Sequence, residues 1–249
     1  MNSIPKNHPR YESLMTRKKI SDAMNKGFVH ETGLIAHGRG EAFDYLLGEK
    51  TNQFAYEAEK VAAAALLYAK KPMISVNGNV IALSASECIS LAKSIPAEIE
   101  VNLFHRTNKR MNLLIGELKR LGANKVLGRL GNALIPGLDH DRGLCDSNGI
   151  FSADVVLVAL EDGDRCQALK KKGKTIIAID LNPLSRTAKS ANITIVDNVT
   201  RAIPNIEKWV KNLKKYDKSF LKKLIDSWDN DKTLSDTLGF ISERLKDTT

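Results

Sequence analysis

The sequence predicts an α/β fold with a mostly parallel sheet, and two patterns in its central part carry that prediction. Six short apolar runs rich in Val and Ile occur at residues 73–76, 99–103, 125–127, 154–160, 175–179 and 193–196. Several are separated by stretches such as 111–121, whose apolar residues recur every three or four positions, as in an amphipathic helix. Strands that alternate with helices are typical of a parallel sheet covered on both faces. The expected core is therefore Rossmann-like.

Helices are expected on both sides of this core. Residues 11–26 have a sparse apolar stripe among charged residues, and Gly27 is a typical helix stop. The alanine-rich segment 54–70 suits a helix with a broad buried face. After residue 198, three successive apolar stripes predict three further helices. These elements make one compact unit, with a helical N-terminal part (1–72), the Rossmann-like core (73–199) and C-terminal helices (200–249).

Composition favours a cytoplasmic protein without a membrane segment. Hydrophobic residues make up 43% of the 249-residue chain, which argues against disorder. The longest apolar run, at residues 61–69, is far shorter than the ~20 residues that a membrane span needs. Residues 1–13 lack the apolar segment of a signal peptide. The three cysteines are far apart and predict reduced thiols rather than a disulfide framework or a zinc site.

The net charge of +9 favours anionic partners, which leaves nucleic acids and small phosphorylated molecules open. A lysine-rich run between residues 208 and 223 could serve as a nucleic-acid stripe. A solvated helix face explains it more simply, and no RNA- or DNA-binding motif accompanies it. The five histidines have no metal-ligand spacing, and a hydrolase elbow GxSxG is absent.

The stretch 33–51, GLIAHGRGEAFDYLLGEKT, resembles a phosphate-binding loop in composition but fits no known loop motif. We interpret it as a loop in which Gly38 and Gly40 let the backbone pass close to a ligand. Residues 41–47 are expected to open a helix whose first amides would favour the same anion. Among the side chains of this stretch, His37 and Arg39 are the candidates for a role in catalysis.

Polar side chains follow five of the predicted strands. Ligands of open α/β sheets bind beyond the carboxyl ends of the strands, so these exits are the candidate site. They comprise Asn77 and Asn79; Asn102, His105 and Arg106; Glu161, Asp162, Asp164 and Arg165; Asp180, Asn182, Ser185, Arg186 and Thr187; and Asp197 and Asn198. Surface turns also favour Asn, Asp and Gly, which is the alternative at any single exit. The arginines at three exits favour a site for an anionic ligand.

The exit after residue 179, DLNPLSRT, is the most informative. A carboxylate here, Asp180, is the group that binds a ribose hydroxyl pair in dinucleotide folds. Arg186 is suited to bidentate phosphate contact, and Ser185 and Thr187 add hydroxyls. Neither GxGxxG after the first strand nor GxxxxGK[ST] is present. The pattern therefore favours a mononucleotide bound by side chains and irregular loops.

The acidic exit EDGDR, residues 161–165, permits two interpretations. Asp162 and Asp164 are candidate Mg²⁺ ligands, because Mg²⁺ prefers oxygen ligands and commonly bridges substrate phosphates. The alternative is an acidic turn in which Asp164 caps the next helix. The sequence does not choose between them.

Several of these segments together resemble one known family. The blocks IPKNHPRYESL, GLIAHGRGEAFDYLLGEKT, ISVNGNV, NLFHRT, IPGLDHDR, SADVVLVALEDGDR, DLNPLSR and ANITIVDN are similar to those of archaeal phosphopantothenate synthetases, also called 4-phosphopantoate–beta-alanine ligases. The resemblance runs from residue 4 to about residue 245. It implies a cytoplasmic homodimer that joins 4-phosphopantoate to beta-alanine and splits ATP, with Mg²⁺, to AMP and diphosphate. Neither nucleic acid nor membrane is an expected partner.

The resemblance also implies a set of ATP-binding residues. These are Arg17, Arg39, Asp180, Leu181, Asn182, Arg186, Thr187, Asn198 and Val199. Asn77, Asn79, Asn102, His105 and Arg106 are candidates for phosphopantoate because of their strand-exit positions. Catalysis is expected to depend on positioning and charge stabilisation, with Arg39 and His37 as the candidate catalytic side chains. A nucleotide-binding regulator without turnover and an RNA-binding protein remain as alternatives.

Overall fold

The computed structural model describes residues 4–246 and confirms the α/β core. Its main sheet has six parallel strands in the order β3-β2-β1-β6-β7-β8. Their bounds are β1 Pro72–Val76, β2 Glu98–Val101, β3 Val126–Leu127, β6 Val155–Ala159, β7 Thr175–Ile179 and β8 Ile193–Ile195. Each lies on one of the six predicted apolar runs. The chain reverses direction across the sheet between β1 and β6, which places a switch point at the centre of its carboxyl edge.

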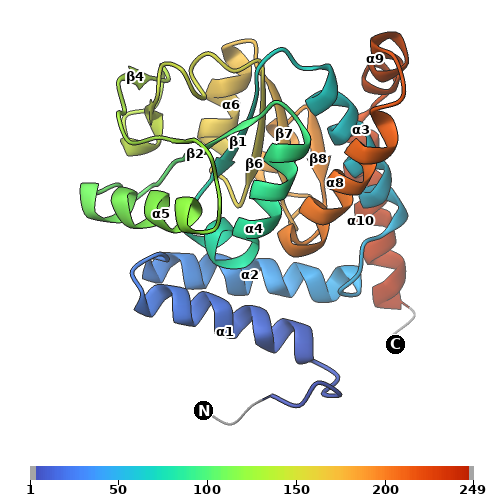
Figure 1. The fold of residues 1–249 in the computed structure, drawn as a ribbon. Helices are drawn as coiled ribbons and strands as arrows, with labels where there is room; N and C mark the ends of the chain where they lie inside the picture. Colours follow the sequence, from blue (N-terminus) through green and yellow to red (C-terminus); the bar gives the residue numbers. More distant parts are fainter. Residues whose placement is uncertain (1–3, 247–249) are drawn as a thin grey trace.

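Successive side chains of the strands enter two separate apolar cores, as the two-residue period of a strand requires. Ile74 and Leu157 pack with helices on one face, whereas Met73 and Val156 pack on the other. The first face is covered by α3 Gln53–Tyr68, α4 Gly78–Ser94, α5 Asn108–Arg120 and α8 Val199–Leu213, and the second by α6 Gly163–Lys171 (Figure 1). Both faces are buried, which explains why the strands are continuously apolar rather than alternating.

The remaining elements surround this core. They are α1 Tyr11–Asn25, α2 Glu31–Leu47, α7 Arg186–Ser190, α9 Lys218–Asp226 and α10 Asn230–Lys246, with a small antiparallel pair β4 Ala133–Leu134 and β5 Leu144–Cys145 and the short 3₁₀ helix η1 Asp141–Gly143. The two predicted N-terminal helices are confirmed within one residue of their expected starts, and the three C-terminal helices predicted from apolar stripes are α8, α9 and α10. The small pair and η1 were not predicted. No helix within residues 4–246 is long and apolar enough to cross a membrane.

The largest correction concerns the stretch predicted as a loop. Helix α2 begins at Glu31 and continues through Gly38 and Gly40, so the phosphate-loop interpretation was wrong. A Cβ at Gly38 would meet no atom within 4 Å, and one at Gly40 would only touch Leu181 at 3.5 Å. Tertiary packing outweighs the low helix propensity of these glycines. Helix α2 lies across the lower edge of the sheet in Figure 1, above α1.

Candidate active site

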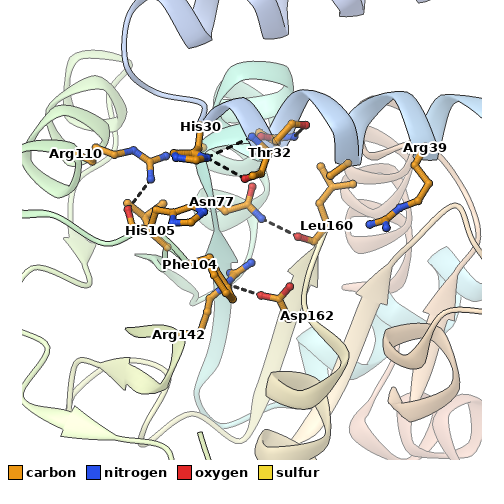
Figure 2. Close-up of a pocket in the computed structure, with 15 residues that line it drawn as sticks. His30, Thr32, Arg39, Asn77, Phe104, His105, Arg110, Arg142, Leu160 and Asp162 are labelled. Atoms are coloured by element: carbon orange, nitrogen blue, oxygen red, sulfur yellow. Dashed lines mark hydrogen bonds and ion pairs between the residues drawn. The ribbon is translucent and has the colours of Figure 1, made fainter. Parts of the chain in front are cut away.

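Two adjoining cavities lie between α2 and the carboxyl ends of the strands. The first, of about 400 Å³, is called the Asp180 cavity. The second, of about 330 Å³, is called the His105 cavity. They share a wall formed by Ala36, Arg39, Leu160 and Asp162. Figure 2 shows Arg39 descending from α2 toward this wall while His105 lies at the opposite end of its cavity.

The Asp180 cavity brings together most of the residues predicted for a nucleotide. Asp180, Leu181, Asn182, Ser185, Arg186 and Thr187 all line it. The backbone N–H of Asn182 donates to Asp180 Oδ1 at 2.9 Å, and Ser185 Oγ donates to Asp180 Oδ2 at 2.5 Å. Burial raises the pKa of Asp180 above its ordinary value, although these hydrogen bonds and the charge of Arg39 oppose the rise. Asp180 is thus a partly buried, oriented acceptor at the end of β7.

Asn77 and Asn79 line the His105 cavity, but their amides are already used by the protein. Asn77 caps α4 by accepting from the backbone N–H of Val80 at 3.1 Å, and its Nδ2 donates to the carbonyl of Leu160 at 3.0 Å. Asn79 Nδ2 donates to the carbonyl of Gly33 on α2 at 2.8 Å. The side chains of Asn77 and Asn79 therefore stabilise the cavity walls. The first turn of α4, which has backbone N–H groups without intrahelical partners, also borders this cavity.

Asn102 and Arg106 are not among the residues that line either cavity. Asn102 is 1% exposed and donates to the carbonyls of Arg142 at 3.3 Å and Leu144 at 2.9 Å, which anchors η1 and the start of β5. Arg106 donates to the carbonyl of Gly128 at 2.5 Å. The turn after β2 directs both side chains to main-chain acceptors, and their contact with phosphopantoate stays a prediction. Their structural role is to hold two irregular segments.

Two arginines that sequence reasoning missed line the His105 cavity instead. Arg110 extends from the first turn of α5, and its guanidinium donates to the carbonyls of His105 at 2.6 Å and Phe28 at 3.0 Å. Arg142 comes from η1 and crosses to the acidic exit after β6. The signal for Arg142 was the charged run DHDR, which belongs to no predicted strand or helix.

Arg142 belongs to a buried charge cluster between the two cavities. Its guanidinium contacts Glu161 Oε1 at 3.0 Å and Asp162 Oδ2 at 2.8 Å, and Arg165 pairs with the other oxygen of Glu161. Burial alone would raise the pKa of Glu161, but the charges of Arg142 and Arg165 outweigh it and lower that pKa. Arg142, which lines the His105 cavity, is thereby fixed beside Asp162 of the shared wall by two carboxylates.

Comparisons with known proteins decide the family. A family model described as phosphopantothenate/pantothenate synthetase matches residues 54–244. A protein of Methanosarcina mazei named 4-phosphopantoate–beta-alanine ligase is 54% identical over 246 residues, covering 99% of this chain and 97% of that protein. One of the same name from Thermococcus kodakarensis is 51% identical over 246 residues, covering 98% and 94%. The chain belongs to the phosphopantothenate/pantothenate synthetase family. The resemblance noted in the sequence is confirmed.

In this family member, the remaining residues predicted to bind ATP do not line either of the two cavities. Asn198 and Val199 line a narrow space of about 20 Å³ behind Leu181 and Gly40. Asn198 caps α8 and donates from Nδ2 to Asp44 of α2 at 3.0 Å. Arg17, on α1, is not a lining residue of the Asp180 cavity, and its Nε pairs with Glu41 Oε2 at 2.8 Å. Contacts of these three residues with ATP remain predictions.

His37 faces away from the shared wall that carries Arg39. It lines the narrow space behind Leu181 and a further cavity between α1, α2 and α4, and its Nε2 is buried without a partner among the described residues. Burial lowers the pKa of His37, so its imidazole is neutral near pH 7. A neutral imidazole is chemically able to accept a proton, but this one does not face the junction of the two cavities.

The described part of the chain has no complete metal site. No group of three or more His, Cys, Asp or Glu in residues 4–246 is placed to hold an ion. Asp162 pairs with Arg142, and Asp164 contacts His140 Nε2 at 3.1 Å. Asp164 does not cap α6, because Asp162 occupies the N-cap position. Asp162 and Asp164 alone are too few oxygen ligands for a protein-held Mg²⁺. They fit an Mg²⁺ that is coordinated mainly by substrate phosphates, and Asp162, on the shared wall, would be its protein ligand.

Gly163 is expected to be essential to the Asp180 cavity. A Cβ at this position would lie 2.3 Å from Cβ of Arg186 and 3.1 Å from the backbone N of Thr187. Gly163→Ala should therefore displace the start of α7 and lower kcat/KM for ATP by about 10²-fold. Gly116→Ala on α5, whose Cβ would meet nothing within 4 Å, is the matched control and should keep normal kinetics. Equal kinetics in both variants would contradict this role of Gly163.

Proposed function

We propose that this protein is an ATP-dependent carbon–nitrogen ligase that condenses 4-phosphopantoate with beta-alanine to 4′-phosphopantothenate, in coenzyme A biosynthesis. The observation that carries the proposal is a pair of cavities joined at Arg39 and Asp162. One contains the partly buried carboxylate of Asp180, suited to ribose hydroxyls, and the other is rich in basic side chains. The names of the relatives over nearly the whole chain support the same reaction.

ATP is proposed to occupy the Asp180 cavity. Asp180 and Asn182 would bind the nucleoside, and Arg186 with the first turn of α6 would face the phosphates. Phosphopantoate would occupy the His105 cavity, with its carboxylate at the shared wall. This arrangement places the two reacting groups on either side of Arg39, where the guanidinium can neutralise charge that develops during transfer. Mg²⁺, when bound to the phosphates, would supply further neutralisation there.

The proposed chemistry activates the acid as an acyl-adenylate. An oxygen of the pantoate carboxylate attacks the α-phosphorus of ATP and diphosphate leaves. The neutral amine of beta-alanine then attacks the acyl carbon, AMP departs with the carboxylate oxygen, and the amine loses a proton. No nucleophile from the protein is required, because positioning of the substrates and stabilisation of charge carry the reaction.

The products of a single reaction test this proposal. Purified protein incubated with ATP, 4-phosphopantoate and beta-alanine is expected to form AMP and 4′-phosphopantothenate in equal amounts, measured by chromatography and mass spectrometry. With ¹⁸O in the pantoate carboxylate, one labelled oxygen should appear in AMP. Formation of ADP and inorganic phosphate would contradict the adenylate route, and binding of ATP without turnover would favour a regulator.

We also propose that the protein is a cytoplasmic homodimer. The buried, free thiols Cys88, Cys145 and Cys166 support a reducing cytoplasm. We expect a homodimer, as the family resemblance implies, and sedimentation of the purified protein would measure its mass. The lysines of α8 and α9 are expected to be solvated, since Lys211 and Lys222 already form i,i+4 pairs with Glu207 and Asp226.

A further inference from the structure

Two histidines stack on each other at the end of the His105 cavity that is remote from Arg39. The ring centroids of His30 and His105 are 3.9 Å apart, with an interplanar angle of 26°. His30 is the N-cap of α2, and His105 belongs to the turn after β2, so two distant segments meet at this pair. Figure 2 shows both rings beside Arg110 at the end of the cavity opposite Arg39. Neither His30 nor Arg110 was predicted from the sequence.

The stacked pair has ring nitrogens that are not used by the fold. His30 accepts a hydrogen bond at Nδ1 from the backbone N–H of Thr32 at 3.3 Å, which leaves its Nε2 available. The ring of His105 has no hydrogen bond within the described residues. Burial, then the neighbouring His30 and Arg110, lower the pKa of His105. Two imidazoles at this distance repel each other when both are charged, and no acidic partner accepts from either ring within the described residues.

The charged groups around the pair favour an anion. Arg110 faces it from α5, and Arg142 faces the same cavity from η1. The acidic groups are Glu31, adjacent to His30 on α2, and Asp162, which is already paired with Arg142 at the shared wall. Gly78 and Asn79, in the first turn of α4, also line this cavity, and a helix N-terminus favours an anion. Cationic and donor groups therefore outnumber acidic groups at this end.

We propose that His30 and His105 bind the phosphate group of the acid substrate, with Arg110, and that the pair takes up a proton from solvent as the phosphate binds. This inference rests on the proposed function. 4-Phosphopantoate carries its phosphate and carboxylate at opposite ends, and the histidine pair and Arg39 likewise lie at opposite ends of the cavity (Figure 2). A dianion between the two rings favours the charged form of both, so the pair distinguishes phosphopantoate from pantoate.

Asparagine variants test this role without removing the helix cap. Asn is among the best N-cap residues, so His30→Asn should keep α2 in place while it removes the imidazole. His105→Asn removes the other ring, and His8→Asn, at an exposed histidine outside both cavities, is the matched control. Binding of 4-phosphopantoate and of pantoate is measured by calorimetry at pH 7.5, in two buffers that differ in ionisation enthalpy. The difference in heat between the buffers gives the protons taken up.

We expect the wild type and His8→Asn to take up protons with 4-phosphopantoate and none with pantoate. Each cavity variant should bind 4-phosphopantoate about tenfold or more weakly, with less proton uptake, while its affinities for pantoate and ATP stay unchanged. Wild-type affinity and uptake in both variants would overturn the proposal. Because binding is measured without turnover, a failure of ligase activity would be seen separately. If the wild type binds no 4-phosphopantoate, both the proposed function and this inference fall.

Discussion

Replacement of Arg39 by alanine is expected to lower kcat/KM for ATP by about 10²–10³-fold, the usual effect of removing one preorganised charge-stabilising group. Arg39 forms no hydrogen bond or ion pair within residues 4–246, unlike Arg17, Arg142 and Arg165, which are all paired. Its charge nevertheless acts on Asp180 across the cavity. A cation that lines both cavities and has no partner of its own is available for a substrate.

Two variants separate a role in charge from a role in folding. Arg39→Lys keeps the charge but loses the planar fork, so its activity should fall between those of the wild type and Arg39→Ala. Arg120→Ala removes an exposed arginine that pairs only with Glu117 on the same helix, and it should leave activity unchanged. Because Arg39 is exposed, its variants should unfold at the wild-type temperature. Near wild-type kinetics in Arg39→Ala would exclude a role at the shared wall.

The core was predictable from the sequence because its signals are local and strong. Val- and Ile-rich runs buried on both faces, such as Thr175–Ile179, have few alternatives to a parallel strand. The Asp180 exit was predictable for a related reason, since the strand end fixes where the next few residues lie. Residues 41–47 were predicted as helical, but the first part of α2, residues 31–40, was missed. Its glycines have poor intrinsic helix propensity, and the packing that stabilises it comes from residues far away in the sequence.

The basic side of the site was harder to predict because side-chain direction there depends on irregular backbone. Asn102 and Arg106 follow β2 closely, yet main-chain carbonyls of distant segments take up their donors. Arg142 comes from η1, which has no periodic pattern. His30 lines the cavity as the N-cap residue of α2, and the start of this helix at Glu31 was not predicted. Position at a strand exit therefore does not by itself predict the direction in which a side chain points.

Glu161→Gln is expected to destabilise the fold by about 3–5 kcal/mol, the usual cost of breaking a buried ion pair. Glu161 and Arg165 have side chains that are 2% and 0% exposed, and Arg142 is 6% exposed. A neutral amide would leave two buried guanidinium groups without their shared counter-charge, and one end of the amide would present N–H donors to them. Denaturant unfolding measures the loss, and Glu117→Gln, in the exposed pair with Arg120, should change stability little.

The pH dependence of stability gives an independent test of the same residue. The folded-state pKa of Glu161 lies below its ordinary value of 4.5, so its ionisation stabilises the fold above that value. This contribution disappears as the pH falls through the lowered pKa. The wild type should therefore lose more stability than Glu161→Gln as the pH is lowered below 4.5. Parallel stability curves for the two proteins in acid would show that the charge of Glu161 does not hold Arg142 and Arg165, and would remove the electrostatic basis of the shared wall.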